Sequence, residues 1–108
     1  MQKQKTKSNP YAVLGHSIDL MNKKPVNFLS IRRKFSSILK TRMIGSDLIT
    51  LHLPSTNQGL RLSIIDNVHG TFFINVRSSK YPNTEIVITA KTNKELLTKL
   101  FYKYEFFT

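Results

Sequence analysis

The spacing of hydrophobic residues changes twice along this chain. Up to residue 44 the apolar positions recur every three or four residues, and from residue 47 to about residue 91 they alternate with polar positions. From residue 93 the first spacing returns. Helices give the first pattern and half-buried strands give the second. The sequence therefore predicts an α+β fold with N-terminal helices, a four-stranded antiparallel meander and a C-terminal helix.

The first predicted helix covers residues 10–22, "PYAVLGHSIDLMN". Ser8 or Asn9 can cap its N-terminus, and Pro10 suits its first position. Gly15 within the segment counts against a helix. One apolar face is nevertheless present, formed by Tyr11, Leu14, Ile18 and Met21.

The second predicted helix covers residues 27–44 and is strongly basic. Asn27 can cap its start, and Gly45 can adopt a left-handed conformation after its end. Its apolar residues fall within a sector of about 100° on a helical projection, which would place them against the sheet. They are Phe28, Ile31, Phe35, Ile38 and Leu39.

Four alternating segments are separated by turn-like sequences, and they cover residues 47–54, 60–66, 71–77 and 84–91. Short connections of this kind favour antiparallel neighbours. One face of the resulting sheet is apolar, and we expect the second helix and the C-terminal helix to cover it. That face carries Leu53, Leu62, Ile74 and Ile88.

The last predicted helix covers residues 93–107, and Thr92 with Glu95 forms a capping box at its start. The chain ends in the aromatic segment "LFYKYEFFT". One helix face cannot bury all of its large side chains, so part of the segment is a candidate contact for a partner protein or a second copy. Those side chains are Leu100, Phe101, Tyr102, Tyr104, Phe106 and Phe107.

The length of 108 residues fits one domain, which we expect over residues 10–108, with residues 1–9 as a flexible basic arm. The apolar runs are too short for a membrane span, and no secretory signal is visible. The chain has no cysteine. These features together fit an intracellular, reducing compartment.

Charge is distributed unevenly along the chain. The net charge is +11, and residues 1–44 carry +9 of it with Asp19 as their single acidic residue. A helix that needed charge only for solubility would mix both signs. Cationic surfaces concentrate near polyanions because counterions are released when phosphates are neutralised. The alternative is a basic composition without any role in nucleic-acid binding.

We therefore expect a small non-catalytic protein that binds DNA or RNA mainly through phosphates, in a ribosome-associated or a viral or phage nucleoprotein role. The helices at 10–22 and 27–44 could form a helix-turn-helix. A basic helix that contacts only phosphates needs less exact geometry. The candidate contacts are Lys3, Lys5, Lys7, Lys23, Lys24, Arg32, Arg33, Lys34, Lys40, Arg42, Arg61, Phe73 and Arg77.

The second face of the predicted sheet supports two interpretations. Arg61, Phe73 and Arg77 share it, so an aromatic ring could stack on an unpaired base while two guanidinium groups hold phosphates. Alternatively, Phe73, Ile65 and Val87 form a second apolar face that the N-terminal helix covers. From the sequence we favour the covered apolar face.

Motifs for catalysis, a cofactor or a metal are lacking. The three histidines fall in separate predicted elements: His16, His52 and His69. Asp66 and Glu85 could lie on neighbouring strands as Mg²⁺ ligands, but Val87 stands where the familiar nuclease pattern has a lysine. We expect neither enzymatic activity nor a cofactor.

A second functional class also fits these residues. An interaction module or inhibitor could dock its basic surface on an acidic partner protein, where charge mainly accelerates encounter and sets specificity. The aromatic C-terminal segment would then be the other contact. DNA or RNA binding remains the main hypothesis, because the excess charge lies in the first 44 residues and not in this segment.

Overall fold

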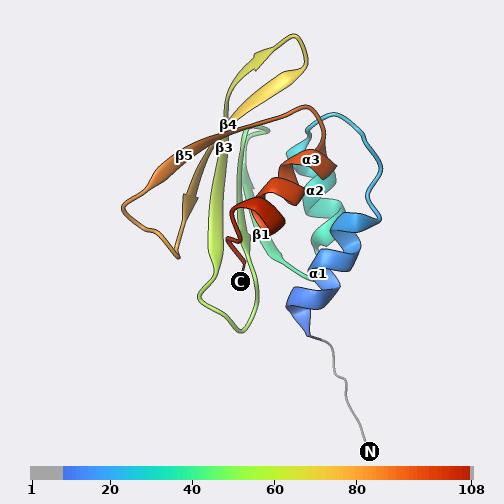
Figure 1. The fold of residues 1–108 in the computed structure, drawn as a ribbon, viewed down its shortest axis with the longest axis vertical. Coiled ribbons are helices and arrows are strands. Elements are labelled where there is room, and N and C mark those ends of the chain that lie inside the picture. The colour runs from blue at the N-terminus through green and yellow to red at the C-terminus, as the bar shows by residue number, and fades with distance from the viewer. Residues whose placement is uncertain (1–8, 108) are drawn as a thin grey trace, which may run out of the picture.

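The computed structural model describes residues 9–107 and shows helices packed on one side of an antiparallel sheet (Figure 1). The α+β fold is confirmed, with five strands instead of the expected four. The helical elements are α1 (Pro10–Asp19), α2 (Phe28–Phe35), α3 (Asn93–Thr98) and the π-helical turn η2 (Lys99–Lys103). The strands are β1 (Lys40–Ile44), β2 (Leu48–His52), β3 (Gly59–Val68), β4 (Thr71–Ser78) and β5 (Glu85–Ala90).

The five strands form a meander in which each strand pairs with the next one along the chain. The expected apolar face is confirmed, because Leu53, Leu62, Ile74 and Ile88 are all buried. They belong to one hydrophobic cluster with residues of α2 and α3, as predicted. The helical members of that cluster include Phe28, Ile31, Phe35, Leu96 and Leu97.

The predicted helix at 27–44 is wrong beyond residue 35. α2 ends at Phe35, whose carbonyl accepts hydrogen bonds from the amides of Ile38 and Leu39 at 2.9 and 2.7 Å. The chain then enters β1, which pairs with β2 along its whole length. Pairing at the sheet satisfies the backbone groups that a longer helix would have bonded internally. Gly45 takes its positive φ of 68° in the β1–β2 turn instead of after a helix.

α1 begins at Pro10, as predicted, but ends at Asp19 instead of residue 22. Asn9 caps α1, since its side-chain oxygen accepts a hydrogen bond from the amide of Tyr11 at 3.0 Å. Gly15 has a packing role inside this helix, because a Cβ atom there would lie 3.1 Å from the ring of Phe101. The glycine thus lets α1 approach the C-terminal segment, where Tyr11 stacks on Phe101.

The C-terminal segment folds back on the core after η2. Glu105 adopts a φ of 53°, and the amide of Phe106 donates a hydrogen bond to the carbonyl of Leu100 at 3.0 Å. This reversal buries aromatic side chains that one continuous helix could not bury. Leu100, Phe101, Phe106 and Phe107 are buried, Tyr104 is half-buried and Tyr102 is exposed.

Two features shape the long β3–β4 hairpin, whose tip extends beyond the rest of the sheet at the top of Figure 1. The register shifts between Ile64 and Asp66, so Ile65 is an extra residue in β3, a β-bulge. The turn uses His69 and Gly70, both with positive φ as in a type I′ turn. His69 is therefore a turn residue.

Candidate nucleic-acid interface

The sheet face opposite the helices is uncovered, and it carries a row of arginines across the strands. In the strand register Arg61 lies between Thr50 on one side and Arg77 on the other. We call this set the arginine row: Arg42 on β1, Thr50 on β2, Arg61 on β3 and Arg77 on β4. All three arginines are exposed, so their guanidinium groups can reach a ligand outside the protein.

Two of the candidate residues lie in a different secondary-structure element from the one predicted. Lys40 and Arg42 were expected on a basic helix, and they lie on β1, where they are exposed. On β1 they lie on the same sheet face as Arg61, Phe73 and Arg77. The five residues that the sequence assigned to two separate surfaces therefore share one.

A shallow depression of about 360 Å³ lies at the arginine row. Arg61 and Arg77 line it from β3 and β4. Polar groups complete the lining: the hydroxyl groups of Thr50 and Ser79 and the imidazole of His52. Guanidinium and imidazole groups are donors that bind phosphate oxygens, whereas the hydroxyl groups of Thr50 and Ser79 already donate to the carbonyls of Arg42 and Asn57. The sequence did not single out His52 or Ser79 as contacts, because only the tertiary structure places them beside the arginines.

The two adjacent arginines differ in their partners. Arg77 forms an ion pair with Glu85 at 3.5 Å and donates to the carbonyl of Pro82 at 3.4 Å. Glu85 also accepts a hydrogen bond from the side-chain amide of Asn75 at 2.9 Å. The side chain of Arg61 has no hydrogen bond or ion pair with any residue from 9 to 107. Its charge is therefore available for an external anion.

The interpretation of a covered second apolar face is wrong. Ile65 and Val87 are 57% and 50% exposed, and Phe73 is half-buried. α1 does not cover them because it packs against α3 on the other side of the sheet. The packing of Tyr11 on Phe101 and the close approach at Gly15 fix α1 there. The open face with Arg61, Phe73 and Arg77 is the arrangement that the structure shows.

A second cationic surface lies on the helical side. Arg32, Arg33 and Lys34 are exposed on α2, and Lys23 and Lys24 are exposed in the linker before it. The linker covers residues 20–27, which is longer than the three- or four-residue turn of a helix-turn-helix. The eight residues of α2 also make it shorter than expected. This surface therefore suits phosphate contacts better than groove reading.

Asn93 holds this linker against α3. Its side-chain oxygen accepts a hydrogen bond from the amide of Asn27 at 2.8 Å, and its own amide donates to the carbonyl of Lys24 at 3.0 Å. The side chain is 4% exposed. Through these two bonds Asn93 fixes the position of Lys24 relative to α2.

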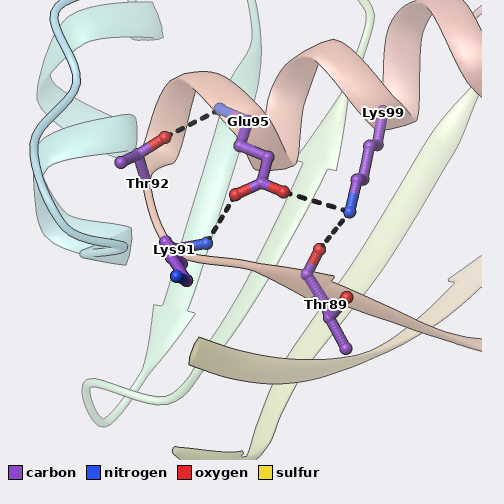
Figure 2. A network of polar contacts seen from close by, with 5 residues as sticks. All are labelled: Thr89, Lys91, Thr92, Glu95 and Lys99. Carbon is purple, nitrogen blue, oxygen red and sulfur yellow. Dashed lines mark hydrogen bonds and ion pairs between the residues drawn. The ribbon is translucent and has the colours of Figure 1, made fainter. Parts of the chain in front are cut away.

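Lys99, which is not a candidate contact, has a different role. Figure 2 shows Lys99 bonded to Glu95 at 3.2 Å and to the carbonyl of Thr89 at 2.6 Å. Glu95 also accepts a hydrogen bond from the amide of Lys91 at 2.8 Å, and its own amide donates to Thr92 at 3.0 Å. The backbone hydrogen bond from Lys91, with the nearby charge of Lys99, holds the pKa of Glu95 below its ordinary value. These contacts tie α3 to β5, so this lysine stabilises the fold.

Most of the candidate cations have no such partners. Within residues 9–107 the two ion pairs are Arg77–Glu85 and Lys99–Glu95. The remaining described candidates are exposed and have no carboxylate partner among these residues: Lys23, Lys24, Arg32, Arg33, Lys34, Lys40, Arg42 and Arg61. Lys3, Lys5 and Lys7 lie outside the described part of the chain.

The carboxylates considered for a metal site are far apart. Asp66 is opposite Phe73 on β4, whereas Glu85 is opposite Arg77. Four residues along a strand correspond to about 13 Å, so these two side chains do not converge. In the part of the chain that the structure describes, no group of three or more potential metal ligands occurs.

Comparison with known proteins gives no relative. No protein-family model matches this chain, and neither the curated proteins nor the solved structures contain a significant match. In residues 9–107 no helix is both long and apolar enough to cross a membrane. Function is therefore inferred from the geometry and charge of the two cationic surfaces.

Proposed function

We propose that this chain is a small, non-catalytic nucleic-acid-binding protein that contacts DNA or RNA mainly through phosphates. One observation carries the proposal: eight of the nine described candidate cations are exposed without a carboxylate partner in residues 9–107. Unpaired charges of one sign repel one another, and phosphates relieve that repulsion while releasing counterions. An intracellular, reducing location fits this role and the absence of cysteine.

Copurified nucleic acid is the first test of this proposal. The absorbance ratio at 260 and 280 nm is measured before and after a high-salt wash of the purified protein. We expect the ratio to fall on washing, because phosphate contacts weaken steeply as salt rises. A protein that binds neither DNA nor RNA in dilute buffer after the wash contradicts the proposal.

Salt dependence then tests the charge mechanism. Replacing Arg32, Arg33 and Lys34 with Gln is expected to reduce the slope of log affinity against log salt by about one unit per lost phosphate contact on duplex DNA. These side chains are exposed and make no ion pair within the described residues, so the variant should fold normally. An unchanged slope would exclude α2 as a contact.

Docking on a protein is the second candidate function. It is favoured by the exposed aliphatic side chains of Ile44, Ile65 and Val87, because such surface often marks an interface. The C-terminal aromatic segment contributes less than expected, since four of its six large side chains are buried. Binding to an acidic polypeptide together with no binding to nucleic acid would select this candidate.

A further inference from the structure

The uncovered sheet face is divided into a cationic half and an apolar half. Two residues beyond the arginine row along each strand, the register forms another row across all five strands. We call it the aliphatic row after Ile44, Leu48 and Val87, and the polar residues Ser63 and Asn75 lie between Leu48 and Val87 in the register. Phe73 lies further along β4 in the same direction, with Ile65 near it at the bulge. The apolar groups are thus grouped on one side of the arginines.

A single nucleic-acid strand likewise has a charged side and an apolar side. Its phosphates form one charged edge, and its unpaired bases expose flat apolar surfaces on the other side. The two rows are about 7 Å apart, since they are separated by two residues along each strand. From β1 to β4 the arginine row spans about 14 Å, at about 4.8 Å per neighbouring strand. That length accommodates more than one phosphate.

We propose that this face binds single-stranded nucleic acid, with the sugar–phosphate backbone running across the strands along the arginine row and the bases over the aliphatic row and Phe73. The inference rests on the nucleic-acid binding proposed above and names its substrate class and orientation. One phosphate occupies the depression between Arg61 and Arg77, where His52 also lines the wall.

The arrangement of the arginines supports an anionic ligand on this face. Arg61 and Arg77 are direct cross-strand partners, and like charges in that position destabilise a sheet. Glu85 neutralises Arg77 but not Arg61. A phosphate between the two strands compensates the remaining charge. A duplex would satisfy the arginines but would leave Ile44 and Val87, which are 59% and 50% exposed, without apolar contact.

Fluorescence anisotropy with labelled oligonucleotides tests the proposal on the full chain. The probes are oligo-dT, a duplex of the same length, and an abasic strand with the same phosphates. We expect oligo-dT to bind more tightly than either of the others. Replacing both Arg42 and Arg61 with Gln is expected to lower oligo-dT affinity roughly tenfold and the salt slope by about 1.4 units, for two lost phosphate contacts on a single strand.

Matched variants separate the two halves of the face. The first double variant replaces Arg42 and Arg61 with Gln. Its control replaces Arg32 and Arg33 with Gln, which removes the same charge from α2 and is expected to change oligo-dT affinity less. A double variant with Ile44→Ser and Val87→Ser is expected to lower the affinity for oligo-dT several-fold, because contacts with the bases are lost. The same pair should leave abasic-strand affinity unchanged. These four side chains and their controls are exposed, and a thermal melt verifies folding.

The outcomes distinguish this inference from the proposed function. Equal affinity for duplex and single strand, or a larger loss from the α2 control than from the arginine-row variant, overturns the inference and leaves nucleic-acid binding intact. Equal loss on oligo-dT and the abasic strand from Ile44→Ser with Val87→Ser overturns the base orientation. No binding to any of the probes overturns both, and binding to polyglutamate alone would then assign the face to an acidic protein.

Discussion

Arg61 lies directly opposite Arg77 on paired strands β3 and β4, and both side chains are exposed. Glu85 pairs with Arg77 at 3.5 Å, whereas Arg61 has no ion pair within residues 9–107. A sheet gains stability when facing charges have opposite signs and loses stability when they have the same sign. This relationship therefore connects the proposed binding face with the stability of the fold.

Replacing Arg61 with Gln is expected to increase the free energy of unfolding by about 0.2–1 kcal/mol, because it removes repulsion between facing charges. The same change should weaken nucleic-acid binding. Urea denaturation and anisotropy measure the two effects on one preparation. Arg77→Gln is the matched comparison: it relieves the same repulsion but also breaks the ion pair with Glu85, so its stability gain should be smaller. A loss of stability in Arg61→Gln would contradict this account.

The Glu95 network predicts a pH dependence of stability. The pKa of Glu95 is lowered in the folded protein from its ordinary value of 4.5. The unfolded state then takes up a proton at higher pH than the folded state, so the stabilisation is complete above about pH 4.5 and is lost as pH falls through the folded pKa. Glu95→Gln should be less stable than the wild type at neutral pH, and the difference should narrow below pH 4.5.

Urea denaturation at a series of pH values measures this difference. Asp47→Asn serves as the control, because Asp47 is exposed and makes no ion pair within the described residues. That control should follow the wild-type curve more closely than Glu95→Gln does. If Glu95→Gln and the wild type remain separated by a constant amount from neutral to acid pH, the network does not depend on the Glu95 charge.

Asn93→Ala is expected to destabilise the protein by about 1–3 kcal/mol, since it leaves the amide of Asn27 without its acceptor. That hydrogen bond is 2.8 Å long. Asn83→Ala, at an exposed turn position, is the control and should have little effect. Chemical denaturation measures both. Faster hydrogen exchange of the linker at residues 20–27 is expected in Asn93→Ala alone, and equal exchange in both variants would contradict the role given to Asn93.

Phe107→Ala is expected to lower the free energy of unfolding by about 3–5 kcal/mol, as for other buried aromatic residues. Phe107 is 2% exposed. Tyr102→Ala should lower the free energy of unfolding by less, because Tyr102 is 49% exposed and its main polar contact is a hydrogen bond to Asp19. Light scattering at two concentrations should show the same oligomeric state for both variants. If either variant changes the oligomeric state without a loss of stability, the C-terminal segment is an intermolecular contact instead.

The sequence predicted most of the sheet, and the reason lies in its alternation. Leu62 stands between two polar residues, Ile74 and Ile88 are each followed by one, and all three are buried as expected. Local caps were also predictable, since Asn27 and Thr92 each bond an amide three residues ahead. These features depend on neighbouring residues, so no knowledge of distant contacts was needed.

The segment after α2 was not predicted correctly. The spacing of Phe28, Ile31, Phe35 and Ile38 is helical and continues past the point where the helix ends. β1 has a weak alternating signal, because its inward residue Thr41 is polar and its outward residue Ile44 is apolar. Gly45 near Asp47, between two alternating runs, is the hairpin signal that could have identified it.

The sequence alone determined the excess of positive charge in the first 44 residues, the periods of the core positions and the helix caps, because each is a property of local order along the chain. The tertiary structure decided which cations share a surface. Arg42, Arg61 and Arg77 are distant in sequence and become neighbours through strand register alone. Register is set by pairing across strands and by burial of one face, and neither can be read from the residues around any one arginine.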